Sequence, residues 1–237
     1  MTSTVEHGVE SKLVDLAVTP LRELNAALHA VGEAGPRHWR VVNPRGAHAV
    51  AAGIDARIEV EIDGHVGYYA AGMNKHATVR IHGNCGTGVA ENIMSGTVVV
   101  DGNASQSAAA TGRGGLVTIR GDAAARCGIS MKGVEIVVHG SVGHMAGFMA
   151  QKGCLVVCGD AGAALGDSIY EARVYVRGTV ESLGADCVEK EMRAEHVAQL
   201  THLLGRAGAE GVQASDFRRY GSARTLYNFH PDNAGSY

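Results

Sequence analysis

One spacing recurs through more than half of this chain of 237 residues. Seven glycines stand 19 residues apart, at Gly64, Gly83, Gly102, Gly121, Gly140, Gly159 and Gly178. Self-similarity at a fixed period of this size is the signature of repeated units that stack, because one such unit cannot bury its apolar side chains alone. The period therefore predicts a stack of like coils, and these glycines are its candidate structural positions.

The residues before each glycine alternate between apolar and polar types. The second and fourth residues before it are always Val, Ile or Leu, whereas the adjacent residue is mostly charged, as in Asp63 and Arg120. A period of two is typical of a short β-strand with one buried face and one solvent-facing face. The seventh residue after each glycine is always Ala or Gly, which predicts that backbone passes close to this position.

The connections between the predicted strands decide how the strands are arranged. About a dozen residues link one strand to the next, without a helical pattern, which fits neither a helical crossover nor a tight antiparallel turn. A chain that winds once per repeat satisfies both constraints. Left-handed hexapeptide helices use about 18 residues per turn, which does not match this period. We therefore expect an all-β-dominated fold, a right-handed parallel β-helix of about seven 19-residue coils between Ile58 and Cys187.

Both flanks of the repeat carry helix signals. Before it, Thr19 and Pro20 are typical of a helix start, and apolar residues then recur at helical spacing at Leu21, Leu24, Leu28 and Val31. After it, the same spacing marks a C-terminal helix at Val197, Leu200, Leu204 and Ala207. Between the first helix and the coils, residues 39–42 and 48–52 flank the turn signature of residues 43–46 and predict a hairpin within an atypical capping coil.

These patterns divide the chain into three segments. Residues 1–55 are expected to form the N-terminal helix, the hairpin and the capping segment. Residues 56–187 are expected to form the β-helix, and residues 188–237 the C-terminal helix and a tail that docks on a partner.

The tail is rich in aromatic and arginine side chains. Aromatic side chains of this size are seldom left in water, so the tail either folds back over the coils or lies on another polypeptide. Interface cores favour Tyr and Arg, which supports the second alternative. The candidate partner-binding residues are Phe217, Arg218, Arg219, Tyr220, Tyr227, Phe229 and Tyr237.

Composition limits the classes of partner and the compartment. A net charge of −3 and a pI of 6.4 give no basic footprint for nucleic acid. No apolar run is long enough to cross a membrane, no signal peptide is recognisable, and the five cysteines are an odd number. We therefore expect a cytoplasmic protein with reduced thiols that binds neither membranes nor nucleic acid.

The sequence shows few signs of a reaction site. Residues 83–88 resemble a phosphate-binding loop but lack its lysine, and their glycines lie where the repeat requires turns. Cys154 and Cys158 are four residues apart on the polar face of a strand, which is no metal motif. Asp167 and Asp186 share one position on adjacent coils and are the best carboxylate pair. We expect no catalytic, cofactor-binding or metal-binding residue in this chain.

The repeats resemble a known domain. Residues 140–147 and 159–166 match a G-x-x-G-x-x-x-G signature that is similar to the β-helix domain at the C-terminal end of the large subunit of glutamate synthase. The flanks at residues 39–48 and 220–229 resemble the β-helix subunit of N-methylglutamate synthase. This resemblance implies a non-catalytic structural subunit of a hetero-oligomer that forms N-methylglutamate and ammonia from methylamine and glutamate.

The same resemblance implies which partners carry the chemistry. An amidotransferase-like subunit and a flavin-dependent synthase subunit would hold the reaction sites, with FMN and an iron–sulfur cluster in the synthase subunit. The chain begins Met1-Thr2, so it lacks the second-position cysteine of an N-terminal-nucleophile amidotransferase. A subunit of a formylmethanofuran dehydrogenase-type or formyltransferase/hydrolase complex in one-carbon metabolism is the alternative. An independent carbohydrate-active β-helix would need acids clustered in one groove, and the sequence shows no such cluster.

Overall fold

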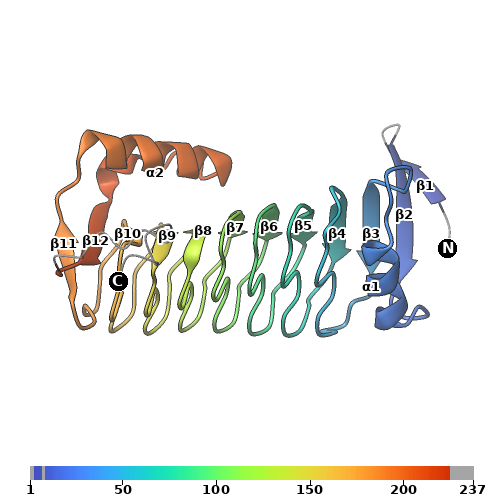
Figure 1. The fold of residues 1–237 in the computed structure, drawn as a ribbon, viewed down its shortest axis with the longest axis horizontal. Helices are drawn as coiled ribbons and strands as arrows, with labels where there is room; N and C mark the ends of the chain where they lie inside the picture. Colours follow the sequence, from blue (N-terminus) through green and yellow to red (C-terminus); the bar gives the residue numbers. More distant parts are fainter. Residues whose placement is uncertain (1–2, 7–8, 225–237) are drawn as a thin grey trace, which may run out of the picture.

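The computed structural model describes residues 3–6 and 9–224. These residues form one sheet of twelve strands in the order β1-β2-β3-β4-β5-β6-β7-β8-β9-β10-β12-β11 (Figure 1). The strands are β1 (Ser3–Glu6), β2 (Val9–Asp15), β3 (His38–Val42), β4 (Glu59–Asp63), β5 (Thr78–Ile81), β6 (Thr97–Val100), β7 (Leu116–Ile119), β8 (Lys132–Val138), β9 (Lys152–Val157), β10 (Arg173–Val176), β11 (Cys187–Lys190) and β12 (Arg218–Ser222). The helices are α1 (Leu21–His29), α2 (Ala194–Arg206) and the 3-10 turn η1 (Ala214–Asp216).

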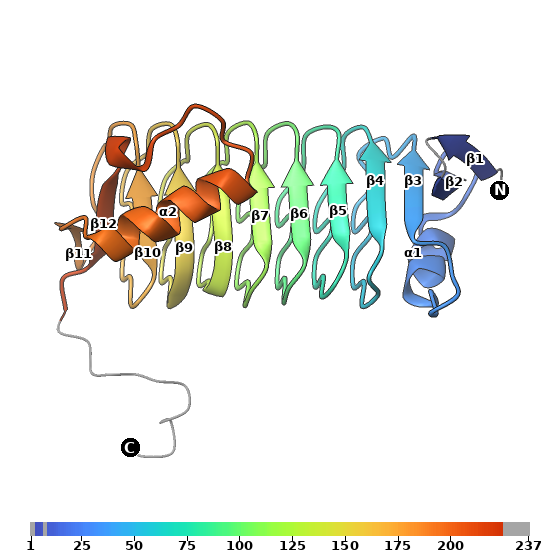
Figure 2. The ribbon, with the colours of Figure 1, turned by 90° about the horizontal axis from the view of Figure 1, so that it is seen from above.

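Strands β4 to β10 confirm the predicted coil stack. Each pairs in parallel with the next, and the paired residues are 19 apart, as in Val79 with Val98, except that Lys132 pairs with Lys152 before a register shift in β8. In Figure 2 the strands on the near face run upward while the chain advances from right to left, which is a right-handed winding. The inward strand residues, such as Ile62 and Val100, are fully buried. A second parallel row of single bridges runs two residues after the glycines, from Val66 through Cys85 to Val180.

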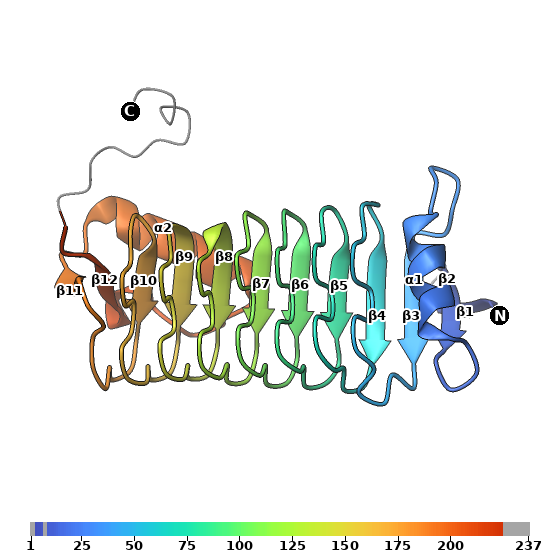
Figure 3. The ribbon, with the colours of Figure 1, turned by 60° about the horizontal axis from the view of Figure 1, so that its bottom comes forward.

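The repeated glycines allow successive coils to touch at their turns, which line up along the axis in Figure 3. A Cβ on Gly83 would lie 2.6 Å from the carbonyl carbon and oxygen of Gly64 on the preceding coil. Beside this contact, the side chains of Asn84, Asn103, Asp122, Ser141 and Asp160 each accept a hydrogen bond from the amide of the residue 19 positions later. The glycines therefore make room for a ladder of side-chain-to-backbone hydrogen bonds between coils.

The small residue seven positions after each glycine has a different cause from the one expected. Ala71, Ala90 and Ala109 are fully buried and have a φ of 52° to 55°, the left-handed region. At the same position Gly128 has a φ of 70°, and a Cβ there would lie 3.1 Å from Cδ1 of Ile136. The expectation of close backbone was wrong: inward side chains across the narrow core and a left-handed backbone set the limit on size.

The N-terminal end extends the stack beyond the predicted boundary. β3 pairs in parallel with β4, but its partners are 21 residues apart, as in Val41 with Ile62. Two extra residues between the strands explain why the 19-residue register did not fit here. Residues 48–52 form turns that stack on the first coil, so the predicted hairpin was wrong, whereas the capping coil is present. Parallel coiling thus begins at β2 and β3, ahead of residue 56.

Helix α1 closes this end of the stack. Leu24 and Leu28 are buried in the main core, and the Asn25 side chain donates to the carbonyl of Ala49 and accepts from the amide of Ala51. The helix begins at Leu21 with Pro20 as its cap residue, one position later than expected. A polar helix covering an end coil is typical of the capping units that repeat proteins require.

The C-terminal end combines two elements that the repeat did not predict. β12 lies between β10 and β11 and is antiparallel to both, so the last described strand is inserted into the sheet. Helix α2 then covers the outer face of β8 to β10, as Figures 1 and 2 show. Leu200, Leu203 and Leu204 pack there in a second core with outward strand residues such as Val137 and Val156.

Candidate functional site

The outward face of the sheet changes character along the axis. On β3 to β6 it carries charged residues that pair across strands, such as Arg40 with Asp63 at 2.8 Å. On β8 to β10 it carries Val137, Val156 and Tyr175, which are fully buried beneath α2. The face that the sequence presents as polar is therefore polar only outside the region that α2 covers.

The five cysteines are free and buried. Burial raises the pKa of Cys85 and of Cys127 to about 12, and it also raises the pKa of Cys154 and Cys158. All are therefore neutral thiols at physiological pH, whereas metal ligation and nucleophilic attack need thiolates. Cys154 and Cys158 lie under α2, so their expected placement on a polar, solvent-facing surface was wrong.

The densest charge cluster lies on the outer face of β5 to β7 and centres on Asp101. Its carboxylate accepts hydrogen bonds from the guanidinium of Arg80 at 3.0 Å and from Nδ1 of His82 at 2.8 Å, and it lies 3.4 Å from Nε of Arg120. Partial burial favours the neutral carboxyl, but the hydrogen bonds from Arg80 and His82 outweigh it, so the pKa of Asp101 is lowered. The cluster is an ion-pair network that holds neighbouring coils together.

The other candidate groups are bound to different partners. His139 bonds to the carbonyl oxygen of Ala207 at 3.1 Å, and burial, only partly opposed by that bond, lowers its pKa. Asp186 is bound to Arg224, and Asp167 accepts from the hydroxyl of Ser168. The described residues bring no three His, Cys, Asp or Glu side chains together in a group that could hold a metal ion.

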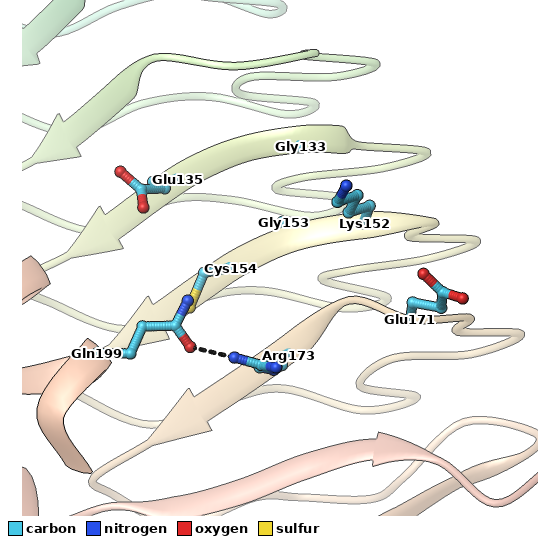
Figure 4. Close-up of a pocket in the computed structure, with 8 residues that line it drawn as sticks. All are labelled: Gly133, Glu135, Lys152, Gly153, Cys154, Glu171, Arg173 and Gln199. Atoms are coloured by element: carbon cyan, nitrogen blue, oxygen red, sulfur yellow. Dashed lines mark hydrogen bonds between the residues drawn. The ribbon is translucent and has the colours of Figure 1, made fainter. Parts of the chain in front are cut away.

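A groove of about 470 Å³ opens between α2 and the strands β8 to β10 (Figure 4). Its lining consists of Gly133, Glu135, Lys152, Gly153, Cys154, Glu171, Arg173 and Gln199. Oε1 of Gln199 accepts from Arg173 at 2.7 Å and lies 3.2 Å from the hydroxyl of Tyr175, which fixes the floor of the groove. Sequence analysis missed this site, because α2 and its strands are adjacent only in space. The recurrence of cations on successive coils is the signal that could have found it.

The structure describes four of the seven candidate partner-binding residues of the tail. Phe217 and Tyr220 are 5% and 2% exposed within this chain, so assigning these two side chains to a partner was wrong. Arg218 donates to the carbonyl of Gly178, and Arg219 donates to that of Glu191. Residues 217–222 therefore fold back on the coils. Tyr227, Phe229 and Tyr237 lie outside the described residues.

A different aromatic group is exposed at the first coil. Tyr68, Tyr69 and Met73 are 50%, 51% and 52% exposed, and the Tyr68 ring stacks on His48 with a centroid separation of 4.5 Å. At the positions of the two tyrosines, the later coils carry smaller or polar residues, such as Thr87 and Ser107. The two tyrosines were not predicted to be a site, although an alignment of the coils shows that they depart from the repeat.

Neither helix in the described part of the chain is long and apolar enough to cross a bilayer.

Comparison with known proteins assigns the family. No protein-family model matches the chain. Its sequence is 61% identical to protein GlxC of Rhizobium meliloti (strain 1021) over 226 residues, which cover 95% of this chain and 99% of that protein. Identity at this level over nearly the whole of both sequences means that they share the same coils and flanks, and the chain therefore belongs to the family of protein GlxC.

Proposed function

We propose that this chain is the structural, non-catalytic subunit of a multi-subunit, flavin-dependent enzyme of the glutamate-synthase-like class. In this proposal it bridges an amidotransferase-like subunit and a synthase subunit, and the latter holds FMN and an iron–sulfur cluster. The assembly is a cytoplasmic hetero-oligomer. N-methylglutamate synthase, which joins methylamine to glutamate and releases ammonia, is the specific enzyme proposed.

One observation carries this proposal: the coils have a closely packed interior and form a continuous stack. The inward rows from β4 to β10 are aliphatic and closely packed, as at Ile81 and Val157, and the outward charges around Asp101 pair with one another. Continuous parallel ladders along one axis resist bending, because every coil is hydrogen-bonded to two neighbours. Such a stack suits a spacer that holds two catalytic partners at a fixed distance.

The buried thiols support placing the redox centre in a partner. A cluster needs several thiolates that converge on one point, whereas Cys127 points into the coils and Cys154 lies under α2. Burial raises the pKa of both thiols.

The test is reconstitution from separate polypeptides. The chain is produced together with candidate amidotransferase-like and synthase proteins of the same organism, and methylamine-dependent formation of N-methylglutamate is measured with and without it. We expect turnover by the assembly and none by this chain alone. Turnover by the isolated chain would contradict the structural role. Co-purification with an amidohydrolase-like and a formyltransferase-like protein would instead favour the one-carbon complex.

The remaining tail residues can be tested in the same assembly. A chain ending at Arg224 keeps β12 but loses Tyr227, Phe229 and Tyr237. If the tail docks on a partner, this chain recovers less of the other subunits than the full chain does. A chain ending before Ser215 is an unsuitable variant, because it also removes β12 from between β10 and β11.

A further inference from the structure

Four cationic side chains stand on four consecutive coils. Arg113, Lys132, Lys152 and Arg173 are separated by 19, 20 and 21 residues, so each lies one coil further along the axis and shifts by at most two residues along the strand. Lys132 and Lys152 are direct partners in the ladder between β8 and β9. The row starts at the turn before β7 and ends in the groove beneath α2, where Figure 4 shows Lys152 and Arg173.

These cations lack carboxylate partners within the described residues, unlike several cations on the earlier coils. Lys75 is bound to Asp55, and Arg80 to Asp101. Among the described residues, no ion pair involves any member of the row, and the hydrogen bond of Arg173 goes to the neutral amide of Gln199. Like charges directly opposite in a ladder repel each other, so the pairing of Lys132 with Lys152 costs stability in the isolated chain.

The carboxylates near the row do not neutralise it. Glu135 lines the groove but is bound to Arg206 of α2. Glu171 also lines the groove and makes no ion pair within the described part of the chain, so it offsets one of the four charges. A net positive row therefore remains on a chain whose formal net charge is −3.

Apolar side chains flank the cations. Met94 occupies the position of Arg113 one coil earlier and is 43% exposed, and Tyr170 stands three residues before Arg173 and is 41% exposed. Between the cations, Gly114 and Gly133 leave the surface without side chains, since a Cβ on Gly133 would overlap the carbonyl oxygen of Arg113. Met, Tyr and Arg around a flat strip of backbone are the composition of a protein interface.

We propose that this cationic row binds an extended acidic segment of another polypeptide, which lies across the coils with its end in the α2 groove. Coils are about 4.8 Å apart, and alternate side chains of an extended strand are about 6.6 Å apart, so successive carboxylates can reach successive cations of a slightly diagonal row. Met94 and Tyr170 then cover the apolar residues of the same segment. This proposed binding surface does not depend on which enzyme the chain belongs to.

The test uses the full chain and a fluorescein-labelled peptide of alternating glutamate and threonine, followed by fluorescence anisotropy at low and at physiological salt. We expect K132E/K152E to weaken binding about tenfold or more, because it reverses the two directly paired charges. The matched control is R22E/R57E, which changes the net charge equally at two exposed cations far from the row. It is expected to bind within about twofold of the unmodified chain.

Further arms keep the proposal falsifiable. The neutral K132Q/K152Q replaces the reversed variant if that one fails to melt cooperatively, and it is expected to weaken binding in the same direction. Equal losses in K132E/K152E and R22E/R57E would overturn the proposal, as would failure of the unmodified chain to bind the glutamate peptide better than a glutamine–threonine peptide. Tighter binding of a single-stranded DNA oligonucleotide of equal charge would also overturn it.

Discussion

Single residues in this fold act through the coil next to them, and Gly83 is the clearest case. Its Cβ position faces the backbone of Gly64, which directly follows strand β4 and cannot move without displacing a coil that is paired with its neighbours on both sides. The cost of a side chain here is therefore set by contact with backbone, which no rotamer change can relieve.

We expect Gly83→Ala to lower the free energy of unfolding by about 1–3 kcal/mol, as overpacking against fixed atoms does. Gly205→Ala is the matched control, because no atom lies within 4 Å of its Cβ position and the residue is helical. That variant is expected to gain about 0.5–1 kcal/mol. Urea denaturation measures both, and equal effects would refute the close-approach argument.

The lowered pKa of Asp101 predicts that the stability of the protein depends on pH. Its pKa in the folded protein is lowered, so its contribution to stability is fully present above the unfolded value of about 3.9 and is lost as the pH falls through the folded value. We expect the unmodified protein to have a higher melting temperature than Asp101→Asn at pH 6. The difference between the two melting temperatures should become smaller below about pH 4. A constant difference from pH 6 to pH 2 would show that the charge of Asp101 contributes nothing.

At the scale of elements, α2 is held by one apolar face. Leu200 is fully buried against the strands, whereas Val197, three residues away on the same helix, is 37% exposed. We expect Leu200→Ala to cost about 2–5 kcal/mol of unfolding free energy. Val197→Ala is expected to stay within about 0.5 kcal/mol of the unmodified chain by the same denaturation experiment.

Elements differ in how far the sequence predicts them. Strands β4 to β10 and both helices could be predicted, because their apolar residues follow a period that is set by local geometry. β12 could not be predicted, since its placement between β10 and β11 depends on contacts some 40 residues away in sequence, such as Arg218 with Gly178. The burial of Cys154 beneath α2 could not be predicted for the same reason, because an outward strand residue is buried only when a helix distant in sequence packs on it.

The candidate sites also divide into features that the sequence predicts and features that depend on contacts between distant segments. The expectation that the chain carries no catalytic residue rests on the residue types alone. The cationic row could have been found by aligning the coils, because Arg113 and Lys132 are one period apart, but its missing counter-charges became visible only in three dimensions.

At the scale of the whole molecule, the stack is almost one-dimensional, since each coil touches only its neighbours. Removal of residues 102–120 deletes 19 residues, one full coil, and joins Asp101 to Gly121 in register. We expect a folded protein whose longest dimension, measured by small-angle X-ray scattering, is shorter by about 4.8 Å.

Removal of residues 102–119, one residue fewer, is the control. It shifts the following strands by one position and turns their aliphatic side chains outward. We expect this variant to aggregate or to melt without cooperativity. Two equally well-folded variants would contradict a core that depends on register.

The insertion of β12 between β10 and β11 has a consequence for synthesis on the ribosome. Coils can be added in order as the nascent chain emerges, but the free edge of β10 stays open until β12, some 40 residues later, has been translated. During that interval the edge is a template for strand pairing with a neighbouring nascent chain. Stalled or prematurely terminated products would thus be the species that a cell must clear by chaperones and proteolysis.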